Sequence, residues 1–299
     1  MPKRHVRNGR GVILNASGCL DALSAPEVAQ SLDAFVTKTV TPLARQGNEP
    51  VRIGETDFGM LNSIGLANPG IDRFVADTLP RLLEIGVSVW VSVGGFAAHE
   101  YADLCARLDD QPIDGLELNV SCPNVSSPEE EVEEIVAAAR AATTKTLYAK
   151  LSPAVPDVGA AAAAAARAGA DGLTLVNTIR GLALDPATLE PRLGPGVGGL
   201  SGPVLRPIAL AAVFAAYRAT GLPIVGVGGV ETGLHGLELI AAGASAFALG
   251  TVLFADPEAP VRVREELEHE AAARGFATPL AAYATAHGQP PPRPLRRVA

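Results

Sequence analysis

Eight short apolar segments recur along the chain, and helical stretches lie between them. Several are continuous apolar runs, which is typical of parallel strands buried on both faces. Eight strand–helix units in 299 residues predict a (β/α)8 TIM barrel. A doubly wound open sheet is the alternative, but it requires a domain boundary or a switch point that the sequence does not display. The expected strands are Gly11–Asn15, Phe35–Lys38, Val87–Val93, Gly115–Val120, Thr146–Leu151, Gly172–Asn177, Ile224–Val227 and Ala246–Leu249.

Three helices are predicted from local sequence patterns. Ser127-Pro128-Glu129-Glu130 is typical of a helix start, with Ser127 as N-cap and Pro128 in the first turn. The alanine-rich run Ala160–Ala168 predicts a helix that ends at Gly169. A further helix is expected over Tyr101–Leu108.

The chain is expected to form one barrel domain over residues 1–288. The segment Val40–Gly70, rich in Pro, Gly and Asn, is too long for an ordinary loop after a strand. We therefore expect an inserted top-face segment that covers the active site. Residues 289–299 form a Pro/Arg-rich tail without periodicity and are predicted to be unpacked.

Composition narrows the function classes. Apolar residues make up 48% of the chain, enough for a sizeable core, and the net charge of −8 argues against a general nucleic-acid or membrane-surface binder. No apolar stretch has the length of a membrane-spanning helix, and the apolar run after the basic N-terminus is too short for a signal peptide. A cytoplasmic location is expected.

The cysteines and histidines do not form a metal-binding pattern. Cys19, Cys105 and Cys122 include no C-x-x-C pair, and the five histidines are scattered. No metal site, in-chain iron–sulfur cluster or disulfide framework is expected.

Polar residues follow the expected strands at the end where barrel enzymes hold their active sites. A cysteine, Cys122, lies in one such loop between Asn119 and Asn124. A buried structural cysteine is one interpretation, and a thiol that moves a proton beside an amide-rich ligand is the other. The other strand ends carry Ser17, Lys38, Thr39, Lys150, Asn177, Thr178, Gly228, Gly229, Gly250 and Thr251.

Two features of these strand ends favour flavin mononucleotide (FMN). The glycines after the seventh and eighth strands stand where barrels commonly bind phosphate through backbone N–H groups. Lys38 and Lys150 would stabilise the negative charge that a flavin gains on reduction. Gly198-Gly-Leu-Ser-Gly202 offers further backbone donors, or is simply a flexible loop.

The combined motifs resemble those of class 1 dihydroorotate dehydrogenases, from about Val12 to Phe254. The resemblance rests on Asn-Ala-Ser-Gly at 15–18, Thr-Lys at 37–38, Gly-Met-Leu-Asn-Ser-Ile-Gly-Leu at 59–66, Asn-Val-Ser-Cys-Pro-Asn at 119–124, Lys-Leu-Ser-Pro at 150–153, Asn-Thr at 177–178, Gly-Gly-Leu-Ser-Gly at 198–202, Gly-Gly at 228–229 and Gly-Thr at 250–251.

The resemblance implies specific roles for these residues. FMN would be bound by Ser17, Lys38, Thr39, Asn119, Lys150, Val176, Gly202, Gly228, Gly229, Gly250 and Thr251. The substrate would be held by Lys38, Asn62, Ser63, Ile64, Gly65, Leu66, Asn119, Asn124, Asn177 and Thr178. Cys122 would take the proton from C5 of dihydroorotate while C6 gives hydride to the flavin, which yields orotate.

Cysteine as the base resembles class 1, and Asn177–Asp185 resembles the B type of that class more than the A type. The B type implies a homodimeric core with a second subunit that carries FAD and a 2Fe–2S cluster and passes electrons to NAD. The fumarate-reducing A type stays open. Cys19, Ser92 and the short Gly18–Lys38 segment depart from the B-type pattern, which has Thr and a flavin-contacting Asn at the first two positions.

Two other functions remain as alternatives. A related FMN barrel could act on another dihydropyrimidine, and reduction of its flavin by dihydrouracil would identify it. The chain could also be a flavin-bearing subunit that has little activity without its partner.

Overall fold

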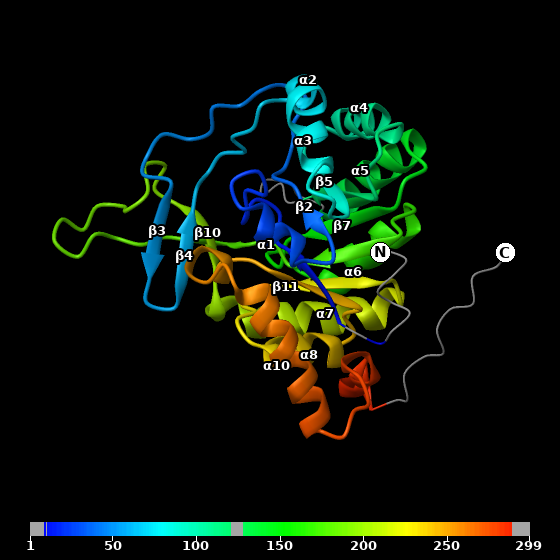
Figure 1. Cartoon of the computed structure of the whole chain (residues 1–299). Coiled ribbons are helices and arrows are strands. Elements are labelled where there is room, and N and C mark those ends of the chain that lie inside the picture. The colour runs from blue at the N-terminus through cyan, green and yellow to red at the C-terminus, as the bar shows by residue number, and fades with distance from the viewer. Residues whose placement is uncertain (1–8, 10, 121–127, 289–299) are drawn as a thin grey trace.

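Eight parallel strands form the centre of the molecule, and helices pack around them (Figure 1). The computed structural model describes residues 9, 11–120 and 128–288. Neighbouring strands follow the order β1-β12-β11-β8-β7-β6-β5-β2. The strands are β1 (Val12–Asn15), β2 (Phe35–Val36), β5 (Val89–Val93), β6 (Gly115–Val120), β7 (Leu147–Leu151), β8 (Gly172–Leu175), β11 (Ile224–Val227) and β12 (Ala246–Leu249). The predicted barrel is confirmed, and each expected strand is present with ends that shift by at most two residues.

Side-chain hydrogen bonds close the barrel between β1 and β2. The Asn15 carboxamide donates to the Val36 carbonyl and accepts from the Val36 N–H, both at 2.8 Å. One step earlier, Asp33 accepts from the Ile13 N–H at 2.8 Å, and a single parallel bridge joins Leu14 to Ala34. Asn15 therefore takes the place of a missing ladder pair, because a carboxamide offers the same donor and acceptor as a peptide group.

The helices cover the outer face of the barrel. Large apolar side chains such as Ile13, Leu118 and Phe247 point toward them, while a smaller cluster that includes Val12, Trp90 and Tyr148 fills the interior. The helices are α1 (Pro26–Gln30), α2 (Ile71–Arg73), the π-helical η2 (Phe74–Thr78), α3 (Leu79–Leu83), α4 (Ala98–Asp109), α5 (Pro128–Ala142), α6 (Val158–Arg167), α7 (Arg206–Thr220), α8 (Gly233–Ala241), α9 (Val252–Ala255) and α10 (Ala259–Ala273), with 3-10 turns η3 (Pro203–Leu205), η4 (Pro279–Ala282) and η5 (Thr285–His287).

The helix signals in the sequence agree with these bounds. The α6 helix ends one residue before Ala168, and Gly169 follows with a φ of +99°. The α4 helix contains the expected Tyr101–Leu108 stretch, with Cys105 buried in it. The proposed N-cap Ser127 lies outside the described residues, as do Cys122, Asn124 and the tail 289–299. None of the described helices has both the length and the apolar character needed to cross a bilayer.

A second, four-stranded antiparallel sheet stands apart from the helices, at the left of Figure 1. Its order is β3 (Ile53–Thr56), β4 (Gly59–Asn62), β10 (Gly198–Ser201), β9 (Ile179–Gly181). The first pair belongs to the expected insertion 40–70, and the second pair follows β8. Residues 198–202 are thus mostly strand, which excludes the flexible-loop interpretation of this segment.

Candidate active site

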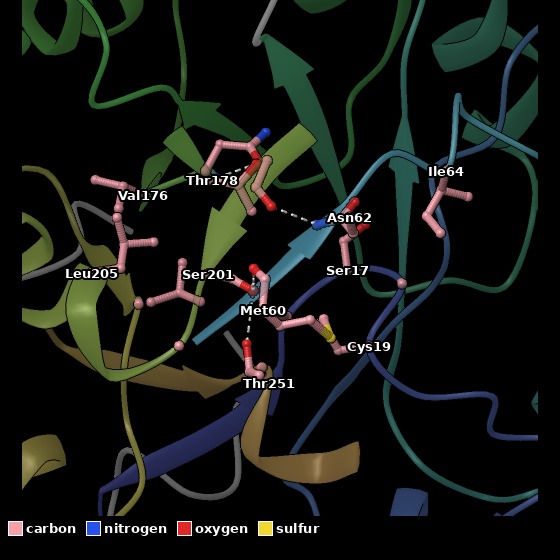
Figure 2. A pocket seen from close by; sticks show the side chains of 18 of the residues that line it. Ser17, Cys19, Met60, Asn62, Ile64, Val176, Thr178, Ser201, Leu205 and Thr251 are labelled. Atoms are coloured by element: carbon pink, nitrogen blue, oxygen red, sulfur yellow. Dashed lines mark hydrogen bonds between the residues drawn. The ribbon is translucent and has the colours of Figure 1, made fainter. Parts of the chain in front are cut away.

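One cavity of about 570 Å³ joins the ends of the barrel strands to the second sheet (Figure 2). This volume is in the range of small-molecule and cofactor sites. All predicted cofactor-contacting residues line it, as do all predicted substrate-contacting residues within the described ranges. Cys122 and Asn124 lie outside those ranges. The two predicted sets are therefore brought together in one place, although they come from nearly every strand of the barrel.

The second sheet forms one wall of this cavity. The Asn62 carboxamide on β4 donates to the Gly199 carbonyl on β10 at 3.3 Å, and the Ser201 hydroxyl lies 2.9 Å from the Thr251 hydroxyl (Figure 2). The backbone at Gly199 passes so close to Thr178 that an added Cβ would lie 2.2 Å from the threonine Oγ1. Glycine at this position lets the sheet approach the barrel.

Two carboxamides at the ends of β6 and β8, the strands on either side of β7, fix each other's orientation. Asn177 Nδ2 donates to Asn119 Oδ1 at 2.9 Å, and Asn177 Oδ1 accepts from the Thr178 N–H at 2.8 Å. Asn119 Nδ2 in turn donates to Thr39 Oγ1 at 3.3 Å. A ligand in the cavity therefore meets amide groups whose rotamers are already held by neighbours, which lowers the entropy lost on binding.

Ser92 supports this wall from behind. It is fully buried, and its hydroxyl lies 3.1 Å from the Thr39 hydroxyl. Its backbone N–H donates a hydrogen bond to Thr37 Oγ1 at 3.1 Å. Ser92 is not among the residues that line the cavity. The place where the B-type pattern has a flavin-contacting asparagine is therefore occupied by a residue that holds Thr39 instead.

Two lysines give the cavity a positive charge. Lys150 is 7% exposed and forms an ion pair with the buried Glu117, with Nζ 3.6 Å from Oε1. Burial, and then the charge of Lys150, lower the pKa of Lys38, while Cys19 acts in the opposite direction. Burial raises the pKa of Cys19 despite the two lysines nearby. The cavity is thus suited to an anionic ligand, and Cys19 is a thiol rather than a thiolate near neutral pH.

A cradle of glycines also lines the cavity. Gly202, Gly228 and Gly229 have φ angles of +101°, +134° and +70°. A Cβ on Gly229 would lie 2.9 Å from the Gly202 carbonyl oxygen and from the Arg206 nitrogen. Such bare backbone lets N–H groups come close to an anion, which a side chain would prevent. The residues present therefore fit a phosphate group beside the glycines and a planar polar ring near the lysines.

Several lining residues are absent from the predicted set. They are Ala16, Gly18, Cys19, Ile53, Met60, Gly199, Ser201, Pro203, Leu205, Val227, Val230, Glu231, Val252 and Phe254. Most belong to the second sheet or to segments beside a predicted residue. The sequence signal for the sheet residues is weak, because its strands are short, half-buried and rich in glycine.

Comparisons with known proteins agree with this site. Residues 7–271 match the model of the family described as "Dihydroorotate dehydrogenase". A putative dihydroorotate dehydrogenase A (fumarate) from Solibacter usitatus is 43% identical over 245 residues, which cover 79% of this chain and 81% of the relative. The catalytic subunit of dihydroorotate dehydrogenase B (NAD(+)) from Desulforudis audaxviator is 43% identical over 277 residues, which cover 88% of this chain and 90% of the relative.

The fold also has solved counterparts. The crystal structure of DHODH in complex with ferulenol from Eimeria tenella superposes with a TM-score of 0.77 at 24% identity, covering 93% of this chain and 85% of that one. At this identity the likeness concerns the fold, and the family assignment rests on the sequence matches. Since the family match spans most of its length, the chain belongs to the dihydroorotate dehydrogenase family, whose members are flavoenzymes.

Proposed function

We propose that this chain binds FMN and oxidises dihydroorotate to orotate, a reaction of pyrimidine biosynthesis. The observation that carries the proposal is the convergence of a glycine cradle, two lysines and interlocked carboxamides in one cavity of about 570 Å³. A phosphate, an anionic reduced ring and an amide-rich substrate each find complementary groups there.

The flavin would be held along the whole cavity. Gly202, Gly228, Gly229, Gly250 and Thr251 would bind its phosphate through backbone and hydroxyl donors, and Ser17, Thr39 and Val176 would line the path to Lys38, Asn119 and Lys150. FMN bound there would supply the acceptor for the hydride, which carries the two electrons of the oxidation. The ammonium groups of the lysines would stabilise the negative charge that accompanies reduction.

The substrate would lie between the second sheet and the carboxamides. Asn62, Asn119 and Asn177 offer both donors and acceptors to the amide edges of dihydroorotate, and Lys38 offers a positive charge to this anionic substrate. Backbone groups of residues 63–66 and the Thr178 hydroxyl complete the contacts on that side. Asn124 is proposed to join them.

Cys122 is proposed as the general base. A thiol has a free pKa of roughly 8.5, so that a modest change in its surroundings makes it an effective base near neutral pH. It would take the proton from C5, while the hydride leaves from C6. The products are orotate, a protonated Cys122 and a cofactor reduced by two electrons.

Relatives carry both A-type and B-type names, so the electron acceptor is a separate proposal. On the motif at 177–185, we favour a homodimeric core that works with a subunit carrying FAD and a 2Fe–2S cluster, with NAD as the final acceptor. Rapid turnover of the isolated chain with fumarate would favour the A type instead.

The visible spectrum under anaerobic conditions tests the main proposal. We expect the purified protein to show a flavin spectrum that bleaches on addition of dihydroorotate. Bleaching by dihydrouracil but not by dihydroorotate would refute the substrate assignment and favour another dihydropyrimidine. A protein that binds no flavin when refolded or reconstituted with FMN would refute the cofactor assignment.

A further inference from the structure

Glu117 is a buried carboxylate that the proposed reaction does not use. It lies on β6, two residues before Asn119, and is 4% exposed. In the sheet register Glu117 is opposite Tyr148, and Asn119 is opposite Lys150. The carboxylate is therefore one layer deeper in the barrel than the lysine, whose side chain reaches the cavity wall.

Little besides Lys150 compensates this buried charge. Among the described residues, no donor lies within hydrogen-bonding distance of Glu117 Oε1, and Lys150 Nζ is 3.6 Å away. The register neighbours on the same side are Ser92 and Tyr148, and the apolar interior cluster with Trp90 lies below. A carboxylate in such surroundings is costly unless a cation offsets its desolvation.

The cationic side of the site is equally crowded. Lys38 and Lys150 both line the cavity, and each is close enough to affect the other electrostatically. Cys19 is the third titratable group near them. Without Glu117, the described part of the site would hold two neighbouring ammonium groups, that of Lys150 buried and that of Lys38 half-buried, with no carboxylate paired to either.

We propose that Glu117 is a positioning residue: it holds Lys150 Nζ at the cavity wall and offsets part of its positive charge, and so limits how strongly the site favours reduced flavin. This inference rests on the proposed function, because it assumes that a flavin binds beside Lys150. Glu117 contacts the lysine from below and acts only through it.

The charge can be removed with little change in shape by Glu117→Gln, since the carboxamide has nearly the size of the carboxylate and keeps an oxygen that can face Lys150. The matched control is Glu133→Gln on α5, which removes a carboxylate from an exposed ion pair with Arg167. The readout is the midpoint potential of the bound flavin, measured at pH 7 by equilibration with a reference dye.

We expect Glu117→Gln to raise the equilibrium constant for two-electron reduction roughly tenfold, the order expected for one buried unit charge. For two electrons this corresponds to an increase of about 30 mV. The control should stay within about twofold of the wild type, because exposed charges are screened. In a Lys150→Gln background the effect of Glu117→Gln should vanish, since Glu117 acts only through Lys150.

The outcomes separate this inference from the proposed function. Absence of bound flavin in the wild type refutes the proposed function itself. A wild-type protein that bleaches with dihydroorotate, combined with equal potentials for Glu117→Gln and its control, overturns the role of Glu117 alone. If Glu117→Gln does not fold, thermal unfolding of Lys150→Gln and of the double variant decides: the double variant should unfold at the higher temperature, and a lower one contradicts the pairing.

Discussion

Asn15 offers a stringent test of how the barrel closes. Its side chain is 1% exposed and makes two 2.8 Å hydrogen bonds to the backbone of Val36 across the β1–β2 gap. In Asn15→Leu, a side chain of similar size would leave the Val36 N–H and C=O buried without these partners. Each unsatisfied group costs about 1–3 kcal/mol, so we expect a loss of about 2–6 kcal/mol in the free energy of unfolding.

Urea unfolding of the flavin-free protein, followed by circular dichroism, measures this loss without interference from ligand binding. Gln30→Ala is the control, because the Gln30 carboxamide also bonds to a backbone carbonyl, that of Ile85, but at the exposed surface. We expect less than about 1 kcal/mol for the control. A similarly small loss for Asn15→Leu would show that the side chain does not close the barrel.

Three further predictions concern the site. Cys122→Ala should slow flavin reduction by dihydroorotate about 10²- to 10⁴-fold in stopped-flow traces, whereas Cys105→Ala in α4 should not; an unchanged rate for the first variant removes Cys122 as base. The pKa of Lys38 is lowered from 10.5, so its ammonium loses its proton at a lower pH than a free lysine does. As the pH rises, the affinity for orotate, measured by titration, should therefore begin to decrease before pH 10.5 is reached; an affinity that stays constant up to pH 10.5 would contradict this. Gly229→Ala should weaken FMN binding at least about tenfold, because φ is +70° and Cβ would meet backbone atoms at 2.9 Å; Gly221→Ala, with φ of +64° and open space, is the control, and equal affinities would contradict a close backbone approach.

The barrel strands could be predicted because their signal is local. Segments such as Ile224–Val227 and Ala246–Leu249 are continuous apolar runs between turn residues, and burial on both faces accounts for that pattern. Parallel strands also bring their C-terminal ends to one rim. The gathering of Lys38, Asn119 and Lys150 in one cavity follows from this topology.

The second sheet could not be predicted in the same way. Its strand β10 has the sequence Gly-Gly-Leu-Ser and is only half-buried along its length, so neither apolar periodicity nor strand propensity indicates it. Its pairing joins Gly199 to Asn62, which are 137 residues apart. The sequence indicated an insertion over 40–70 but offered no reason to pair it with the segment after β8.

Side-chain roles that depend on a neighbouring strand could not be predicted from the sequence either. Asn15 belongs to one of the motifs that carry the resemblance, yet its carboxamide joins two strands. Ser92 stands where the resemblance implies a flavin-contacting asparagine, and its hydroxyl contacts that of Thr39. Glu117 appeared as one polar residue in an apolar run, and its significance depends on the 3.6 Å approach of Lys150 from the next strand.

The pairing of β4 with β10 has a consequence for how binding and folding are linked. Both strands belong to insertions outside the barrel ladder, so the barrel can be complete while this wall is still open. A ligand that contacts both insertions stabilises their pairing. By thermodynamic reciprocity, any change that stabilises the pairing also increases the affinity for the ligand. Substitutions on the outer face of this sheet, far from any reacting atom, should therefore alter affinity through the fraction of molecules in which the wall is assembled.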